Sequence, residues 1–241
     1  MKRLWEVDLL RGIAIILMII FNYSFALSYL NIYTFSGGTF YWYIFPRIIA
    51  GMFISISGLS LTLSYSQTKN KIESHKKIFT RGLKIFWFGI LITIITFFTF
   101  PEAFIIFGIL HLIGFSMIFG QFFIKFKKLN LLLGLLIILL GFYLQDFRFD
   151  FPWLLWLGFI PKNFYTFDYF PVLPWFGVSL LGIFFGNVLY KNGKRNFKIR
   201  DFSNSSVVRF ISFLGRNSLT IYLIHQPLLI LLLIILGFKI F

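Results

Sequence analysis

The chain has 241 residues, of which 59% are hydrophobic and 13% are charged. A soluble domain of this length could not hide so much apolar surface, so the composition excludes that class and indicates an integral membrane protein. The net charge is +15, and the chain has no cysteine, which excludes disulfides, thiolate nucleophiles and cysteine-bound metals.

Seven apolar runs are long enough, or nearly so, to cross a hydrocarbon core of about 30 Å. We therefore expect an all-α, polytopic transmembrane helix bundle that forms a single domain over 1–241. Too little chain lies between these runs for a separate soluble domain. The expected spans are 9–30, 44–66, 78–99, 103–124, 129–144, 169–190 and 217–240.

The basic residues are distributed according to the positive-inside rule. If the N-terminus is cytoplasmic, 19 of the 23 Lys and Arg residues, Lys2 and Arg3 among them, fall on the inner side of seven spans. Lys239 falls outside. The pattern predicts an N-in, C-out protein of a cell membrane, whose Ile-, Phe- and Lys-rich composition suggests a prokaryote. The net positive charge is then explained by contact with anionic lipid, and no nucleic-acid partner is expected.

The first span opens with Asp8 and Arg11, three residues apart at the mouth of an apolar run. Residues with this spacing share one helix face, so the two charges can bond each other. Charged groups deep in a bilayer cost roughly 2.5–3.5 kcal/mol each, so such groups tend to be paired, interfacial or functional. The alternative is a helix-start acid beside an Arg that extends to the interface.

The segment near 147–163 has too few consecutive apolar residues to span a membrane and too many aromatic ones to lie free in water. It is bounded by Pro152 and Pro161, and its Trp and Phe residues favour the membrane interface. We expect a short re-entrant or interfacial element over the outer mouth of the bundle, which serves either as a lid on a site or as an anchor.

The last span carries His225, with Pro227 two residues later. Proline removes a backbone donor, and irregular backbone at membrane depth occurs where it lines a cavity or is buried in protein. His225 is therefore either a cavity group or a hydrogen-bonded link between helices. Before this span, Arg216 is expected at the cytoplasmic interface, with Asn217 or Ser218 capping the helix.

Two other large polar groups lie within spans: Asn22 in the first and His111, flanked by glycines, in the fourth. Each needs a partner or water in the membrane. His75 lies in a basic loop and is expected to be solvated. No metal cluster, Ser-His-Asp spacing or phosphate-binding glycine loop is present, so an enzyme, a transporter and a helical scaffold all fit these residues.

The chain resembles the small prokaryotic members of the heparan-alpha-glucosaminide N-acetyltransferase catalytic family, within the wider transmembrane acyltransferase group. Five segments carry the resemblance in family order, and the first and last are fairly specific together. They are Glu6–Met18, Phe53–Leu61, Gly108–Gly114, Pro174–Gly182 and Gly215–Pro227.

The resemblance implies a multi-pass enzyme that moves an acetyl group from cytosolic acetyl-CoA, its co-substrate, to an acceptor on the far side. Heparan sulfate, the acceptor of the animal enzyme, does not suit a prokaryote-like chain. The implied acceptor is an amine or hydroxyl of a cell-envelope sugar or a lipid-linked glycan. No metal is implied.

The family's proposed catalytic residues carry over in part. Asn22 matches an Asn late in the first span, whereas the loop 31–40 lacks the His that the family has there. His111 stands where the animal branch tends to have Gln. We expect His225 or His111 to take the proton from the attacking group, since an imidazole titrates near neutral pH.

Other residues have expected supporting roles. Asn22 and Arg11 would donate hydrogen bonds to the thioester oxyanion, with Asp8 orienting Arg11. Inner-face basic residues would hold the CoA phosphates, unless they serve only the positive-inside charge. These expected CoA-binding residues are Arg81, Lys84 and Arg216.

Two other classes of protein stay open. A permease for small or lipid-like solutes could use the same polar interior, although transporters often have paired interrupted helices and Pro227 marks one break without a clear counterpart. A non-catalytic membrane scaffold would tolerate apolar residues in place of Asn22, His111 and His225. Any of these proteins could be a homo-oligomer.

Overall fold

The structure is a computed structural model that describes residues 4–191 and 193–238. Within them the chain forms eight α-helices and one short antiparallel hairpin, β1 (Tyr190–Lys191) with β2 (Lys194–Arg195). The fold is therefore all-α, as the composition predicts. Lys2, Arg3 and Lys239, which enter the expected charge distribution, lie outside the described residues.

The chain divides into two compact units, Met1–Phe53 with Ile199–Phe241, and Ile54–Lys198. We call them the terminal unit and the central unit. The terminal unit holds α1 (Trp5–Tyr29), a π-helical turn (Phe40–Ile44), the start of α2 (Phe45–Gln67), α7 (Ser206–Arg216) and α8 (Ser218–Ile235). The central unit holds the rest of α2, α3 (Lys71–Thr99), α4 (Ile109–Gly120), α5 (Leu129–Gln145), α6 (Val172–Leu189) and the hairpin.

Five helical segments of the described chain are long and apolar enough to cross a membrane. They are Trp5–Tyr29, Phe40–Gln67, Lys71–Thr99, Val172–Leu189 and Ser218–Ile235. Two more of the expected spans correspond to the shorter helices α4 and α5, with 12 and 17 residues. At a rise of 1.5 Å per residue α4 is only about 18 Å long. The number of seven crossings and the single domain over 1–241 stay predictions.

Two helices differ from the expected spans because polar groups fix their starts. α3 begins at Lys71 and not near 78, since the Asn70 side chain accepts hydrogen bonds from the backbone N–H groups of Ile72 and Glu73. α4 begins only at Ile109, whose N–H is bonded by the Asp168 carboxyl group. The residues from 101 to 108, expected within the fourth span, form turns and irregular backbone.

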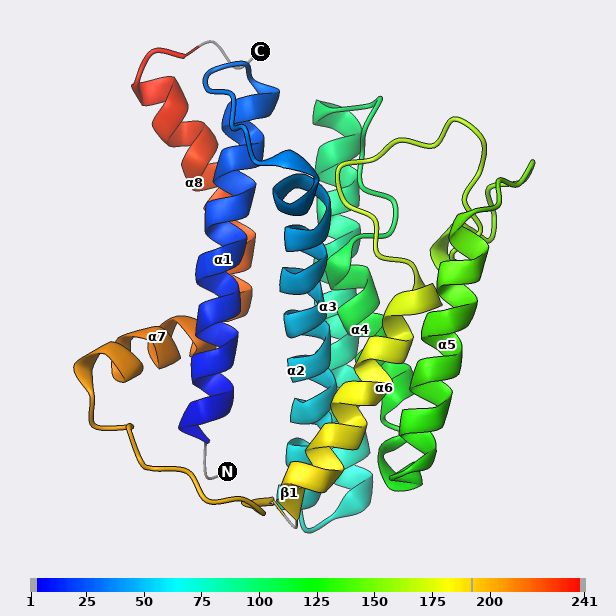
Figure 1. Ribbon diagram of the computed structural model, residues 1–241, viewed down its shortest axis with the longest axis vertical. Coiled ribbons are helices and arrows are strands. Elements are labelled where there is room, and N and C mark those ends of the chain that lie inside the picture. The colour runs from blue at the N-terminus through cyan, green and yellow to red at the C-terminus, as the bar shows by residue number, and fades with distance from the viewer. Residues whose placement is uncertain (1–3, 192, 239–241) are drawn as a thin grey trace. The chain divides into compact units, whose positions relative to one another are not determined.

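In the terminal unit, α7 crosses the start of α1 with the two backbones in direct contact (Figure 1). A Cβ atom added to Gly215 would lie 1.8 Å from the Asp8 carbonyl oxygen, and one added to Gly12 would lie 1.9 Å from that of Ile211. Small residues allow such close approach between helices in membranes. Further along α1, the buried Ile15 and Met18 pack with Ile49 of α2.

Helix α7 lies between the expected spans 169–190 and 217–240, where the sequence analysis expects no helix. It buries a face with helical spacing that includes Ser212 and Gly215, whereas Val207, Phe210 and Phe213 are more than half exposed. The expected Asn217 cap is wrong. The Asn217 amide donates to the Phe213 carbonyl and so closes α7, while α8 has no side-chain cap.

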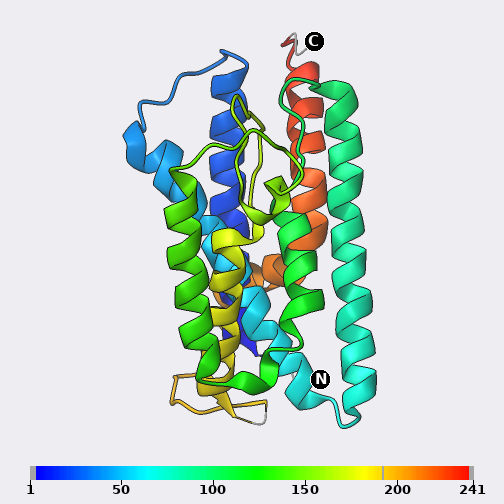
Figure 2. The same ribbon diagram turned by 90° about the vertical axis from the view of Figure 1, so that its right-hand side faces the viewer.

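The central unit is also built on close contacts at small residues. Between α5 and α6, a Cβ atom added to Gly134 would lie 2.9 Å from the Gly177 carbonyl oxygen, and one added to Gly177 would lie 2.5 Å from that of Gly134. In α2 and α6, a Cβ at Gly58 or Gly182 would lie 2.2 Å from the backbone oxygen of the facing helix. Figure 2 shows α5 and α6 side by side, with the loop 146–171 beyond their upper ends.

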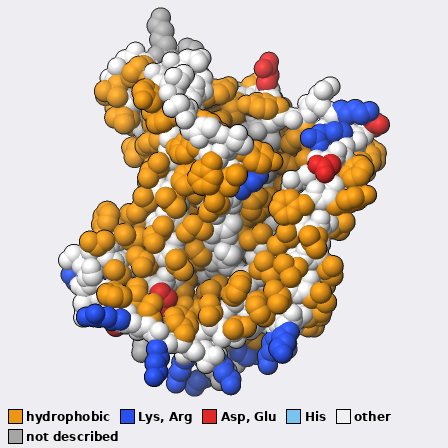
Figure 3. Space-filling model, viewed as in Figure 1, with side chains coloured by type: hydrophobic (Ala, Val, Ile, Leu, Met, Phe, Trp, Pro, Cys, Tyr) orange, Lys and Arg blue, Asp and Glu red, His pale blue; other side chains and the backbone are white. Residues whose placement is uncertain are grey.

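Many large apolar side chains point away from the protein. Phe98 is 77% exposed and Trp87 60%, and in the α3 window only 11% of the residues are buried. On the face shown in Figure 3, hydrophobic side chains cover the flanks of the helices, while Lys and Arg gather toward their ends. A surface of this kind is suited to contact with lipid chains.

We expect Gly215→Ala to destabilise the protein by about 1–3 kcal/mol or more, because the new methyl group would have to displace the backbone of α1. The thermal midpoint in detergent should fall accordingly. Gly51→Ala is the matched control, since nothing lies within 4 Å of a Cβ atom there. An unchanged midpoint for Gly215→Ala would contradict the close α1–α7 contact.

Candidate functional site

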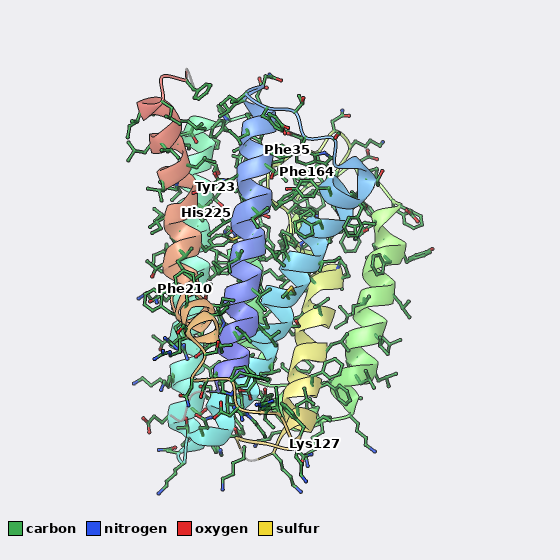
Figure 4. All side chains as sticks on the ribbon, turned by 60° about the vertical axis from the view of Figure 1, so that its left-hand side comes forward. Tyr23, Phe35, Lys127, Phe164, Phe210 and His225 are labelled. Atoms are coloured by element: carbon green, nitrogen blue, oxygen red, sulfur yellow. The ribbon has the colours of Figure 1, made fainter. Side chains whose placement is uncertain are left out.

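Two of the predicted site residues, Asn22 of α1 and His225 of α8, are in contact in the terminal unit. The Asn22 Nδ2 atom lies 3.1 Å from His225 Nε2. His225 is 5% exposed, and Asn22 is partly buried. Figure 4 shows His225 beside Tyr23 where α8 runs along α1. The pair satisfies two polar groups that would otherwise be costly at membrane depth.

Two contacts determine which nitrogen of the neutral His225 ring carries the hydrogen. Nδ1 lies 2.6 Å from the Tyr222 carbonyl oxygen, which can only accept a hydrogen bond, so Nδ1 carries the hydrogen. Nε2 then holds the free lone pair and accepts a hydrogen bond from the Asn22 amide. The nitrogen that faces α1 is therefore the one able to take up a proton.

The backbone around His225 has its own bond to α1. The Tyr23 hydroxyl donates to the His225 carbonyl oxygen at 3.2 Å. Pro227 lies inside α8 and has no N–H for the carbonyl four residues earlier, which locally weakens the helix ladder. Neighbouring side chains of α1 thus bond both the ring and the main chain of His225.

Asp8 and Arg11 lie at the other end of α1. The Arg11 guanidinium donates to Asp8 Oδ1 at 3.4 Å, and Asp8 is 8% exposed. At 1.5 Å per residue, Arg11 lies about 16 Å along the helix from Asn22. The two side chains therefore cannot donate to the same oxyanion, and the expected pairing of Asn22 with Arg11 in that role does not fit the geometry.

The predicted CoA-binding residues fall in both units. Arg216 ends α7 next to Gly215, which touches the Asp8 backbone, so it belongs to the same end of α1 as Arg11. Arg81 and Lys84 are exposed and share one face of α3 in the central unit. Each cluster offers a surface for anions. Within the described residues, no group of three or more His, Asp and Glu side chains could hold a metal ion.

His111 belongs to the central unit, where its ring is held in the opposite way to that of His225. Its Nδ1 accepts a hydrogen bond from the Gly108 backbone N–H at 3.3 Å, so the hydrogen of the neutral ring is on Nε2. The ring lies between Phe86 and Phe107, with centroids 5.3 and 5.4 Å away. His111 therefore presents a donor, whereas His225 presents a lone pair.

Asp168 holds the start of α4 beside His111. Its Oδ2 accepts the Ile109 backbone N–H at 3.0 Å, and a Cβ atom at Gly108 would lie 2.3 Å from the same oxygen. Burial raises the pKa of Asp168 from its usual 3.8 to about 6, although the bond from Ile109 works against this. The carboxyl group thus titrates in mildly acidic solution.

A cavity of about 510 Å³ opens beside His111 in the central unit. Thr93 and His111 are its two polar lining residues, and the other side chains are apolar. These come from α3, α4, the turns before α4 and the loop 146–171. They are Phe86, Ile90, Ile106, Phe107, Phe115 and Trp156.

The loop 146–171 contains the expected interfacial element and packs on the start of α4. A short 3₁₀ turn, Leu155–Leu157, buries Leu155, and the Tyr169 hydroxyl donates to the Leu155 carbonyl oxygen at 2.7 Å. The Phe170 N–H bonds the Phe107 carbonyl at 2.9 Å. Trp156 of this loop lines the cavity, and the choice between a lid and an anchor stays a prediction.

Sequence reasoning did not single out Tyr23, Asp168 or Trp156. Tyr23 adjoins Asn22, and its bond goes to a backbone atom that no side-chain pattern reveals. From the sequence, Asp168 is only an acidic residue on the expected outer side of the membrane. Its place shortly before a proline and an apolar helix could have marked it as a candidate functional residue. Trp156 reaches its cavity only through the fold of a loop.

The raised pKa of Asp168 predicts a pH dependence of stability. The folded chain binds this proton more tightly than the unfolded chain. The contribution of Asp168 to the free energy of unfolding should therefore fall as the pH rises from about 4 to about 6. In Asp168→Asn the side-chain oxygen can still accept the Ile109 N–H, but the thermal midpoint should change less with pH over this range. Asp150→Asn, at an exposed carboxylate of the same loop, should leave the slope unchanged. Equal slopes in all three proteins would refute the prediction.

Comparison with known proteins gives one assignment. No curated protein and no solved structure matches the chain. The family model described as "Heparan-alpha-glucosaminide N-acetyltransferase, catalytic" matches residues 3–227 and so includes Asn22, His111 and His225. With apolar helices long enough to cross a membrane, the chain belongs to the heparan-alpha-glucosaminide N-acetyltransferase catalytic family, a family of membrane acetyltransferases.

Proposed function

We propose that the protein transfers an acetyl group from cytosolic acetyl-CoA to an amine or hydroxyl of a cell-envelope sugar or lipid-linked acceptor. The observation that carries the proposal is the His225 Nε2 lone pair, buried between α1 and α8 against Asn22, in a chain of an acetyltransferase family. A general base needs an unprotonated nitrogen within reach of the attacking group.

In this proposal His225 is the base. The acceptor's N–H or O–H group replaces the Asn22 amide as the donor to Nε2, and its proton passes to the ring as the nucleophile attacks the thioester carbonyl. A C–N or C–O bond forms, the C–S bond breaks, and CoA leaves as a thiolate that is then protonated. The Nδ1–H bond to the Tyr222 carbonyl supports the charged imidazolium.

Asn22 supplies the second function. Once displaced from Nε2, its amide has both N–H groups available for the oxyanion that develops on the thioester oxygen. Preorganised donors in a water-poor site are among the largest contributions to acyl transfer. Tyr23 acts as a positioning residue, because it bonds the His225 backbone and not its ring.

The basic residues at the inner ends of the helices would bind the CoA phosphates. Arg11 and Arg216 belong to the same end of α1 and offer guanidinium forks that match phosphate oxygens. The distance of about 16 Å along α1 from Arg11 to Asn22 suits an extended molecule that is bound at one end and reacts at the other. Arg81 and Lys84 are a second candidate set on α3.

The first test is binding of acetyl-CoA to the protein purified in mild detergent. A ligand at about 100 times its Kd adds about 2.7 kcal/mol to stability, so the thermal midpoint should rise with acetyl-CoA and with CoA. ATP and inorganic phosphate at matched ionic strength are the controls. An equal shift with every anion, or none, would favour the permease or the scaffold.

The second test is transfer of radiolabelled acetyl groups from acetyl-CoA to glucosamine and to a bacterial lipid extract. His225→Ala should keep the acetyl-CoA shift and lose about 10²- to 10⁴-fold in rate, because it lacks the base. His75→Ala is the control because it removes a third imidazole that is not a predicted base. The expectation that His75 is a solvated loop residue is wrong: it lies near the start of α3, partly buried, with Nδ1 3.1 Å from Gln121 Oε1. Full activity in His225→Ala would exclude this residue as the base.

A further inference from the structure

The cavity beside His111 has the character of a site for an apolar molecule. Its volume of about 510 Å³ is within the range of ligand pockets, which run from about 300 to 1,000 Å³. Six of its eight lining side chains are apolar. No Lys, Arg, Asp or Glu lines it, which argues against the phosphates of CoA.

Two polar groups interrupt the apolar wall. His111 is 4% exposed, and its bond to the Gly108 backbone uses Nδ1, which leaves the Nε2 side of the ring for the cavity. The Thr93 hydroxyl is one of several buried side-chain atoms without a hydrogen-bond partner in the described part of the chain, and it is the one on this cavity. Buried polar groups are normally bonded, so the Thr93 hydroxyl beside the His111 ring favours a ligand with a polar atom.

The fixed ring of His111 defines the chemistry of that atom. Because Nδ1 accepts the Gly108 N–H, the neutral ring can only donate from Nε2 into the cavity. The ligand must therefore carry a hydrogen-bond acceptor, and the uncharged lining favours a neutral one, such as an ester or carbonyl oxygen. The Thr93 hydroxyl can donate to the same oxygen or to another one nearby.

The loop over the cavity is fixed in place by bonds to the turns before α4. The Thr166 hydroxyl bonds the Phe104 carbonyl at 2.8 Å, and the Phe167 N–H bonds that of Ala103 at 3.1 Å. Trp156 is thereby held at the wall. A ligand that reaches this site in a membrane protein comes most directly from the lipid phase.

We propose that this cavity binds an acyl chain of a bilayer phospholipid, whose ester oxygen accepts a hydrogen bond from His111 Nε2. The lining residues belong to the central unit. Binding at this site does not depend on acetyl transfer.

Photolabelling tests the proposal in nanodiscs. One probe is phosphatidylcholine with a diazirine on one acyl chain, and the other is a polyprenyl phosphate with a diazirine on its tail. Label should concentrate on peptides that contain Ile90, Phe115 and Trp156, and excess unlabelled lipid of the same kind should remove it. Phosphatidylcholine should label these peptides at the lower concentration. Preferential labelling by the polyprenyl phosphate, which has no ester or carbonyl oxygen on its tail, would overturn the proposal. Label spread evenly over exposed helix faces would overturn the proposal.

A variant whose larger side chain fills the cavity can be compared with a matched variant outside the cavity. Ile90→Trp should reduce labelling of the cavity peptides by tenfold or more, since the larger ring takes the space of the chain. Ile94→Trp, at a half-exposed position of the same helix, should label as the wild type does. Equal labelling of both variants contradicts the site. If Ile90→Trp does not fold, competition by unlabelled lipid in the wild type decides.

The His111 donor is tested with a diazirine fatty acid methyl ester and its all-hydrocarbon analogue. The wild type should prefer the ester by about two- to tenfold, as one hydrogen bond predicts. His111→Phe should lose this preference, whereas His111→Gln, which has both an acceptor for Gly108 and a donor for the ligand, should keep it. A preference that survives in His111→Phe would show that His111 does not bind the oxygen.

Discussion

The chemistry of this protein depends on how a backbone group fixes each buried imidazole. A neutral His ring can be an acceptor or a donor at either nitrogen, and only its surroundings select the form. His225 gives its Nδ1 hydrogen to a carbonyl of its own helix, and His111 receives a backbone N–H at the start of α4. The same residue type is thus a potential base in one unit and a donor in the other.

The fold class and the principal polar residues could be predicted from the sequence. Composition and apolar runs indicate an all-α membrane protein, and the spacing of Asp8 and Arg11 predicts the contact that is present. The pairing of Asn22 with His225 joins residues from opposite ends of the chain. Each residue stands out in the sequence as a large polar group within an apolar span, but no periodicity within a single helix predicts that the two form a pair.

The parts that could not be predicted depend on tertiary contacts. α7 packs against the start of α1 because Gly215 lets the two backbones approach, and nothing in the order of residues names that partner. α4 begins at Ile109, whose N–H is accepted by the carboxyl group of Asp168, far along the chain. The choice between His225 and His111 as the base likewise depends on carbonyl and amide groups that have no signature in the order of residues.

The bond between Asn22 and Nε2 of His225 also bears on a side reaction that any membrane acetyltransferase must limit. A bound thioester next to a free base would be hydrolysed by any stray water molecule. In the proposed reaction the Asn22 amide already occupies the lone pair, so water would have to compete with the amide before it could be activated. A stronger nucleophile held in place by its own binding contacts would win that competition, and acetyl-CoA would be kept for the acceptor.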